Sequence, residues 1–222
     1  MHAQAERMRR LIDDLMSLSR IELGEHIPPS GEVDLSLVAV DVLEALAPLA
    51  GERGVEFRPS LPPAGEALLT GARDQILQVI QNLAENAVKF TPSSGIVTVE
   101  IVAGMDAETA SAQLCAGAAH HSLLTPDHDL NARYIVLRLR DHGPGIASAH
   151  MPRLAERFYR VEGQKSANRS GSGLGLAIVK HIVNRHRGGL TVESAEGQGS
   201  TFTVYFPMPS SRQPATVAAG AI

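Results

Sequence analysis

The sequence contains a single cysteine, Cys115, among its 222 residues. An internal disulfide is therefore excluded, and such sparing use of cysteine is compatible with a reducing compartment, which favours the cytoplasm. The chain also has no apolar run near the roughly 18 to 20 residues that a helix needs to span a bilayer. No apolar segment follows the charges at its N-terminus, so we expect neither a membrane span nor a secretory signal here.

A strong charge of either sign is absent as well. Lysine and arginine total 20 against 24 acidic residues, and no basic run is longer than a pair. The electrostatic footprint of a nucleic-acid-binding protein is missing, so we expect no nucleic-acid partner. No internal repeat is visible, and a 44% apolar chain of this length suits one globular core with an appendage.

Residues 1–26 predict one long amphipathic helix. The apolar positions that recur at alternating steps of about three and four are Met1, Met8, Leu11, Leu15 and Leu18, widened by Ile12 and Ile21. This helix either packs on its own domain or forms part of a helical hairpin or dimerisation element. Residues 27–33, which include a proline pair, break the helix and are expected to form a linker.

Residues 34–207 predict an α+β domain. Helical patterns cover 35–54, 72–92 and 174–189, and the β-branched runs 95–102 and 132–141 predict paired strands. Shorter strand patterns bring the expectation to about five strands and three helices. The tail, 208–222, offers nothing to bury and is expected to be disordered.

Residues 103–133 lie between the two predicted strands and are long for a loop inside a compact domain, so we interpret them as an insertion. This segment contains Cys115, His120, His121 and His128. Their spacing matches no standard metal-ligand pattern, which favours solvated polar residues over a metal site.

The polar face of the helix at 72–92 carries an unusual set of side chains. At about 100° per residue, Asn82, Asn86 and Lys89 fall on one side, opposite the apolar stripe. Amide oxygens suit a hard cation such as Mg²⁺, and the ammonium suits a phosphate. For this helix taken alone, a solvated face remains the alternative.

The stretch DHGPGI places Asp141 at the end of a strand and two glycines directly after it. Gly143 and Gly145 allow the backbone to turn and to approach a flat ligand closely. A carboxylate at this point can accept a hydrogen bond from an exocyclic amine such as that of adenine. The alternative is a β-turn in which Asp141 forms an Asx-turn.

Three glycines, Gly171, Gly173 and Gly175, precede the last helix. Bare backbone N–H groups at a helix N-terminus form an anion site, for which phosphate is the natural occupant. A dinucleotide fingerprint would need glycine at Leu176 and a strand before the loop, and a Walker loop would need a following Gly-Lys-Ser/Thr. Neither pattern is present.

In this order and spacing, the three motifs, a basic stretch around ERFYRVEG and the final GQGSTFTVYFP resemble the N, G1, F, G2 and G3 boxes of the histidine-kinase ATP-binding domain. The resemblance covers Asp34 to Pro207 and implies a two-layer α/β sandwich with a mixed sheet. This is the Bergerat-type fold of gyrase, MutL and histidine kinases, here preceded by one long helix. An ATP lid would span 147–172. The amino-acid sequence of these motifs is most similar to that of phosphate-regulon sensors.

The resemblance also implies roles for individual residues. Asn82 and Asn86 would hold Mg²⁺, Asp141 would bind the adenine amine, and the catalytic residues would be Asn86, Lys89 and Arg160. The positions assigned to ATP are Asn82, Asn86, Lys89, Phe90, Asp141, Gly143, Gly145, Ile146, Tyr159, Arg160, Gly171, Gly173, Leu174, Gly175, Leu176 and Thr201. ATP and Mg²⁺ are thus the expected cofactors.

Two residue types are absent where relatives have them. Hydrolysing relatives carry a glutamate one turn before the magnesium asparagine, whereas Asn82 has no basic oxygen, so slow hydrolysis is expected. None of the nine histidines lies in the H-E-x-x-T-P type of acceptor motif. Residues 1–26 resemble instead the second helix of the dimerisation hairpin, and the chain resembles a fragment that begins after the acceptor helix.

The expected function is transfer of the γ-phosphoryl group to a histidine outside this chain, for relay to a response-regulator aspartate. The intact protein would be a homodimer through the hairpin. Its catalytic part would be cytoplasmic, and it would be anchored in the bacterial inner membrane only through N-terminal segments. Two alternatives stay open: a non-catalytic ATP-binding regulatory module, and an ATP hydrolase of the gyrase or MutL kind.

Overall fold

The computed structural model describes residues 2–23, 29–126, 132–161 and 171–209. Its strands are β1 (Gly31–Asp34), β2 (Glu56–Ser60), β3 (Leu68–Gly71), β4 (Ile96–Met105), β5 (Ala119–Leu124), β6 (Tyr134–Arg140), β7 (Gly189–Ala195) and β8 (Gly199–Pro207). Its helices are α1 (His2–Leu23), α2 (Leu35–Glu52), α3 (Arg73–Phe90), α4 (Ala107–Ser111), α5 (Gly175–Arg185) and the 3₁₀ helix η1 (Ser148–Arg153).

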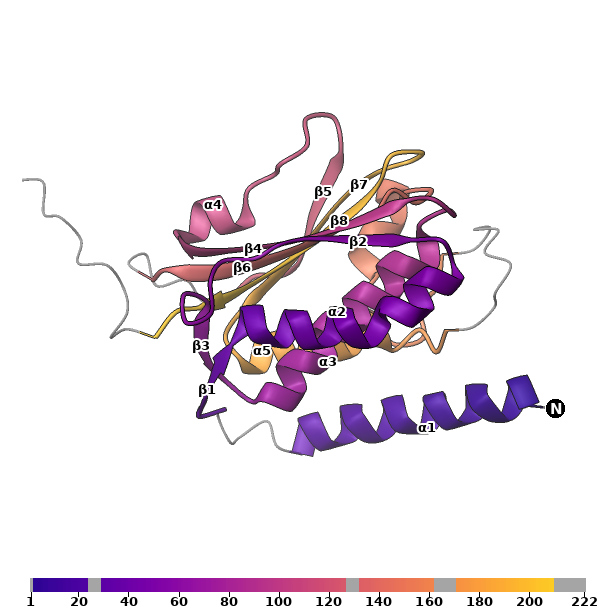
Figure 1. Ribbon diagram of the computed structural model, residues 1–222, viewed down its shortest axis with the longest axis horizontal. Coiled ribbons are helices and arrows are strands. Elements are labelled where there is room, and N and C mark those ends of the chain that lie inside the picture. Colours follow the sequence, from indigo (N-terminus) through magenta and orange to yellow (C-terminus); the bar gives the residue numbers. More distant parts are fainter. Residues whose placement is uncertain (1, 24–28, 127–131, 162–170, 210–222) are drawn as a thin grey trace, which may run out of the picture.

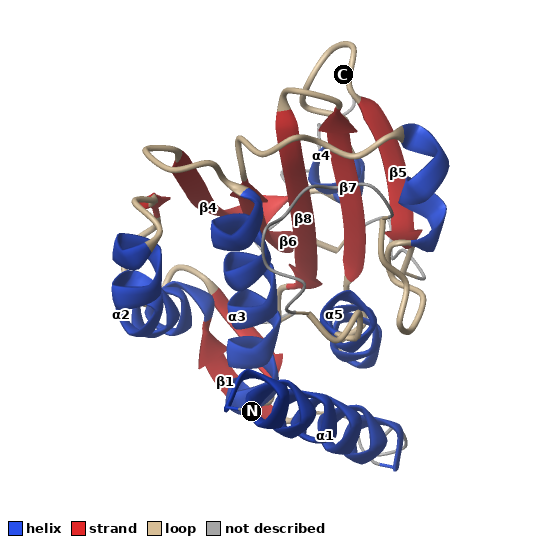
Figure 2. Cartoon of the chain, turned by 90° about the vertical axis from the view of Figure 1, so that its right-hand side faces the viewer, coloured by secondary structure: helices blue, strands red, loops and turns tan. Residues whose placement is uncertain are grey.

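A six-stranded sheet in the order β2-β4-β6-β8-β7-β5 forms one layer, and α2, α3 and α5 cover one of its faces (Figures 1 and 2). The β2–β4 pairing is parallel and every other pairing in this sheet is antiparallel. The expected two-layer sandwich with a mixed sheet is therefore confirmed. The long strands at 96–105 and 134–140 pair with each other, as their alternating patterns predicted.

The main core lies between the sheet and the helix layer. The apolar stripe predicted for α3 is buried there, with Ile76, Val79 and Ile80 at 0% exposure. From the sheet, β6 contributes alternate residues such as Leu137 and Leu139, because successive side chains of a strand point to opposite faces. Burying each of these side chains stabilises the fold by about 1.5–3 kcal/mol.

The opposite face of the sheet is partly covered by residues 103–133, the segment interpreted as an insertion, and the described part of this segment contains regular structure. Residues 103–105 continue β4, α4 packs on the sheet, and β5 is an edge strand that pairs antiparallel with β7. A second, small core lies beneath α4 and includes Tyr134, Val136 and Tyr205.

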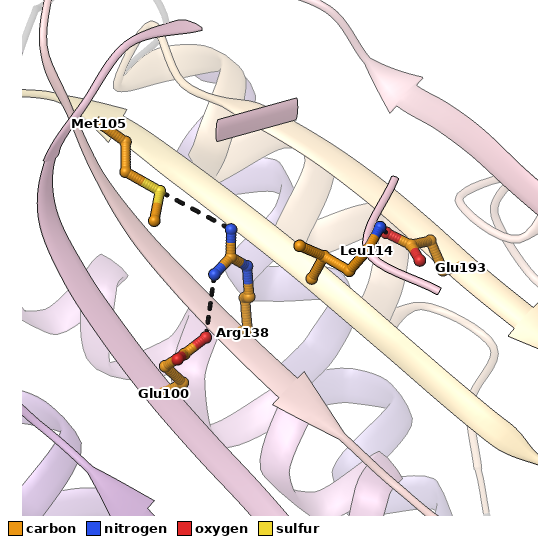
Figure 3. A network of polar contacts seen from close by, with 5 residues as sticks. All are labelled: Glu100, Met105, Leu114, Arg138 and Glu193. Atoms are coloured by element: carbon orange, nitrogen blue, oxygen red, sulfur yellow. Dashed lines mark hydrogen bonds and ion pairs between the residues drawn. The ribbon is translucent and has the colours of Figure 1, made fainter. Parts of the chain in front are cut away.

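Buried charges attach the segment after α4 to this outer face. Both carboxylate oxygens of Glu193 accept backbone hydrogen bonds at 2.9 Å. One comes from Leu114 (Figure 3) and the other from Cys115. Close by, Arg138 donates to Glu100 at 2.9 Å and contacts the sulfur of Met105 at 3.7 Å (Figure 3).

The part of the chain that the structure describes holds no cluster of three or more His, Cys, Asp or Glu side chains suited to a metal ion.

Two predicted boundaries move. Residues 31–33, assigned to the linker, belong to β1, which pairs antiparallel with β3. Asp34 follows as the N-cap of α2, as predicted, and its Oδ1 accepts hydrogen bonds from the backbone of Ser36 and Leu37. At the other end, the Met208 N–H donates to the Arg133 carbonyl at 2.7 Å, so the predicted tail starts at least one residue too early. Residues 210–222 lie outside the described residues.

Helix α1 lies outside the helix layer and packs on α5 (Figure 1). Leu18 and Ile21 are buried against the main core, whereas Met8, Ile12 and Leu15 are more than half exposed. Part of the predicted stripe thus packs on the chain's own domain, and part of it remains on the surface. Within the described residues, no helix is long and apolar enough to cross a membrane.

His186 connects the end of α5 to the start of α3. Its Nε2 accepts the N–H of Ala72 at 3.1 Å, so Nδ1 carries the proton and donates to the Ile182 carbonyl at 2.8 Å. This arrangement needs the neutral ring. Burial, the largest cause, lowers the pKa of His186 below its usual 6.5.

We expect His186 to make the fold sensitive to acid. Because its folded pKa is lowered, the unfolded chain binds more protons just below pH 6.5, and this contribution to stability is lost as the pH falls from 6.5 toward the folded pKa. The test compares unfolding free energies of the wild type and His186→Gln between pH 8 and pH 5. The advantage of the wild type should shrink in acid, and a difference that does not depend on pH would contradict the assignment.

Candidate nucleotide-binding site

A cavity of about 640 Å³ opens beside α3. Thirteen of the sixteen residues assigned to ATP line it: Asn82, Asn86, Lys89, Phe90, Asp141, Gly145, Ile146, Tyr159, Arg160, Gly171, Gly173, Gly175 and Leu176. The structure therefore brings three separate motifs into one space. Its volume falls in the range of small-molecule and cofactor sites.

The three other assigned residues do not line the cavity. The Gly143 N–H donates a hydrogen bond to Asp141 Oδ1, and Leu174 is fully buried. Thr201 lies on the other face of β8 from its neighbours Ser200 and Phe202, which do line the cavity. On β8, Ser200 therefore faces the cavity where the sequence had indicated Thr201.

Asp141 is only 5% exposed, and its two carboxylate oxygens have different surroundings. Oδ1 accepts hydrogen bonds from the backbone N–H groups of Gly143 at 2.8 Å and Ser200 at 3.3 Å. No described residue donates to Oδ2. Burial raises the pKa of Asp141, and the two N–H donors oppose that rise by favouring the carboxylate. The result is one acceptor oxygen available to a ligand on the cavity wall.

The loop after Asp141 is fixed to the hairpin between β7 and β8. The Ile146 N–H donates to the Ser194 hydroxyl and the Gly197 N–H donates to the Pro144 carbonyl, each at 2.8 Å. Ser194 in turn donates to the Gly199 carbonyl at 2.7 Å. These bonds hold Gly145 and Ile146 at the cavity wall.

The polar face of α3 forms another wall. The Asn82 Nδ2 donates to the Gln78 carbonyl at 2.9 Å, and a side chain at Gly175 would lie 2.8 Å from the Asn82 Oδ1. No hydrogen bond joins the Asn86 side chain to another described residue, so its oxygen is available to a ligand. Two amide oxygens one helical turn apart fit a hard cation that is shared with phosphate oxygens.

Three cations gather at this cavity. Burial is the largest cause that lowers the pKa of Lys89, followed by the positive charges of Arg160 and Arg53. The Arg53 guanidinium is held at the end of α3 by the Lys89 carbonyl, at 3.3 Å. A Cβ at Gly171 would lie 2.9 Å from the Lys89 ammonium. Positive charge with bare backbone beside it suits a polyphosphate.

The beginning of the predicted lid packs firmly on the domain. Met151 of η1 is 1% exposed within the main core. The His150 Nδ1 and the Tyr159 hydroxyl lie 2.7 Å apart, and the Phe158 N–H donates to the Gly173 carbonyl at 2.9 Å. Residues 162–170 lie outside the described residues, so the lid stays a prediction there.

Comparison with known proteins agrees with this geometry. Residues 71–210 match the family described as histidine kinase-, DNA gyrase B-, and HSP90-like ATPase. The chain belongs to this family. It is 33% identical over 206 residues to the phosphate regulon sensor protein PhoR of Pseudomonas aeruginosa, which covers 93% of this chain and 40% of PhoR. The chain therefore spans less than half of that relative.

Solved structures support the same assignment. The mycobacterial sensor histidine kinase MprB aligns with a TM-score of 0.58 at 26% identity, over 81% of this chain and 99% of that chain. Full-length ShkA in complex with AMPPNP aligns with a TM-score of 0.66 at 22% identity, over 93% of this chain and 37% of that chain, which shows the fold alone. The resemblance to a sensor histidine kinase ATP-binding domain is confirmed.

The histidine-kinase domain has cavity residues that the motifs did not indicate. Arg53 follows α2, Ser172 lies between two motif glycines, and Asp13 and Asp14 come from α1. Only Ser172 could have been found from the sequence, because a hydroxyl at a helix N-terminus is a recognisable anion ligand. Arg53, Asp13 and Asp14 reach the cavity through tertiary packing and leave no local pattern.

Proposed function

We propose that this domain binds ATP with its adenine against Asp141 and its phosphates toward Lys89, Arg160 and the Gly171–Gly175 loop. The observation that carries the proposal is the pairing of opposite features in one cavity. Asp141 offers a buried acceptor oxygen, and the other wall gathers positive charge that no described acidic residue neutralises by an ion pair. An amine-bearing base with a polyphosphate tail satisfies both.

Asn86 and Asn82 would hold Mg²⁺, which would add positive charge at the phosphates. These residues fit the ion because the Asn86 amide has no described protein partner and Asn82 presents its oxygen beside Gly175. Lys89 and Arg160 would orient the γ-phosphoryl group and neutralise charge as the bond to the leaving ADP breaks. The chain's contribution is thus position and electrostatics.

The acceptor in this proposal is a histidine imidazole outside the chain, which would pass the phosphoryl group to a response-regulator aspartate. The intact protein would dimerise through a helical hairpin that includes α1, on the cytoplasmic side of the inner membrane. Support comes from the sensor histidine kinases that the chain resembles. It also comes from Asn82, whose fixed amide cannot act as a base toward water.

In the test, Mg-ATP labelled on its γ-phosphate is added to the chain alone and to the chain together with a separate hairpin domain that carries the H-E-x-x-T-P motif. We expect nucleotide binding in both cases, label on the added domain, and none on the chain itself. Asp141→Asn serves as the control, which should transfer much less label than the wild type at an ATP concentration near the wild-type Kd.

Other outcomes identify the alternatives. Nucleotide binding without transfer to any acceptor hairpin would favour the regulatory module. Steady release of phosphate without an acceptor would favour the hydrolase, for which Glu85 is the candidate base, because its carboxylate lines the cavity and accepts from Gln81 at 2.8 Å. Labelling of the isolated chain would contradict an external acceptor.

A further inference from the structure

Helix α1 brings two adjacent carboxylates, Asp13 and Asp14, to the wall of the nucleotide cavity. The Asp14 Oδ2 accepts a hydrogen bond of 2.5 Å from the Ser172 hydroxyl. That hydroxyl also accepts the Leu174 N–H at 3.1 Å, directly before α5. An acidic side chain of α1 therefore binds the loop that would receive the phosphates.

These carboxylates do not neutralise the cations of the cavity. No ion pair between described residues joins Asp13 or Asp14 to Lys89, Arg53 or Arg160. The pKa of Lys89 is lowered by burial and by its positive neighbours Arg160 and Arg53. A bound triphosphate would thus share the cavity with two carboxylates that form no ion pair with these three cations. The Debye length is about 10 Å at 0.1 M salt, so repulsion within one cavity should weaken as the salt concentration rises.

The attachment of α1 to the domain is limited. Leu18 and Ile21, near its C-terminal end, are its buried apolar side chains among those described, whereas Ile12 and Leu15 remain exposed. At the level of the cavity, a hydrogen bond from Ser172 to Asp14 joins α1 to the domain. Figures 1 and 2 show α1 as a separate rod outside the helix layer. A modest difference in ligand affinity can therefore shift the equilibrium between docked and released α1.

We propose that docked α1 opposes the triphosphate through Asp13 and Asp14, so that nucleotide binding releases the cavity-facing part of α1. The inference rests on the proposed function, because it assigns a regulator to that same site. By linkage, whatever pulls α1 away from the domain strengthens nucleotide binding by the same factor. The ligands whose affinity depends on α1 are polyphosphates, because an uncharged nucleoside is not repelled by the two carboxylates.

The test measures binding of ATP and of adenosine to the full chain and to the double variant Asp13→Asn, Asp14→Asn. Asparagine keeps the size of each side chain and removes its charge. We expect the Kd for ATP to fall roughly 3- to 10-fold at low salt, with a smaller gain at high salt. The Kd for adenosine should not change. Asp41→Asn is the matched control, because Asp41 is an exposed carboxylate on α2 that pairs with Arg73 away from the cavity.

Hydrogen exchange of α1 provides a second measurement, which does not depend on a variant. Saturating ATP should speed amide exchange over residues 11–21 of the wild type, and adenosine should not. Equal ATP affinity in the wild type and the double variant, together with unchanged exchange, would overturn the inference and leave the proposed function intact. Equal strengthening of ATP and adenosine would overturn the charge argument. Absence of ATP binding in both proteins would instead refute the proposed function.

Discussion

Replacing Asp141 by asparagine is expected to weaken ATP binding about 30- to 150-fold, which corresponds to about 2–3 kcal/mol. The two oxygens of Asp141 explain why so small a change has this effect. Oδ1 is committed to the N–H groups of Gly143 and Ser200. An asparagine must keep its carbonyl oxygen at that place, so its NH₂ group points at the ligand. A donor then faces the donating amine of adenine.

Inosine triphosphate provides the control for this prediction. It carries a carbonyl oxygen where adenine carries the amine, so the Asp141→Asn variant should lose preference for ATP over inosine triphosphate. Its stability to denaturation should not fall, because burial raises the pKa of Asp141 and an amide removes a costly buried charge. Unchanged ATP affinity in a folded variant would show that the base lies elsewhere.

The raised pKa of Asp141 also has a consequence for pH. Adenine needs the ionised carboxylate, so ATP affinity should begin to fall at a pH above the ordinary 3.8 of aspartate as the pH is lowered. The sign for folding is the reverse. A raised folded pKa contributes stability that is fully present below 3.8 and is lost as the pH rises through the folded pKa. Protonation of Asp141 in acid should therefore weaken ATP binding without unfolding the domain.

Local sequence patterns predicted the elements that pack on their own near neighbours. The stripe Ile76, Val79 and Ile80 predicted the buried face of α3, and the alternating strands 95–102 and 132–141 predicted the β4–β6 pair. They did not predict β5, because AHHSLL has weak strand character and its partner strand β7 lies about 70 residues away. β1 was missed for a similar reason, since its few residues need the distant β3 as a partner.

The site divides in the same way. The glycines and polar residues of the motifs occur at fixed spacings along the chain, and most of them line the cavity. The motif indicated Thr201, whereas Ser200 lines the cavity, because the alternation of a strand sets which neighbour faces it and a motif alone does not fix that register. Arg53 and Asp14 reach the cavity only because α2 and α1 pack beside α3 and α5. No local signal reports such packing.

Substituting Gly145 by alanine is expected to destabilise the domain by about 3 kcal/mol or more and to abolish nucleotide binding. Gly145 has a φ of 71°, and a Cβ there would overlap the carbonyl oxygen of Ala195. The left-handed backbone costs a non-glycine residue about 1–2 kcal/mol, and forcing apart two packed backbone segments adds about 1–3 kcal/mol. Both segments are tied by hydrogen bonds, so neither can shift at low cost.

Gly197 separates the two contributions, because it has a similar φ of 79° but open space around the position of a Cβ. Gly197→Ala should therefore cost only the backbone strain, about 1 kcal/mol, and should leave ATP binding near the wild-type level. Chemical denaturation and ATP titration of both variants make the comparison. Equal losses of stability would mean that the loop after Asp141 yields to the added methyl group. The hydrogen bonds from Ile146 to Ser194 and from Gly197 to Pro144 would then hold the loop less rigidly than expected, and ATP binding would not need a rigid loop.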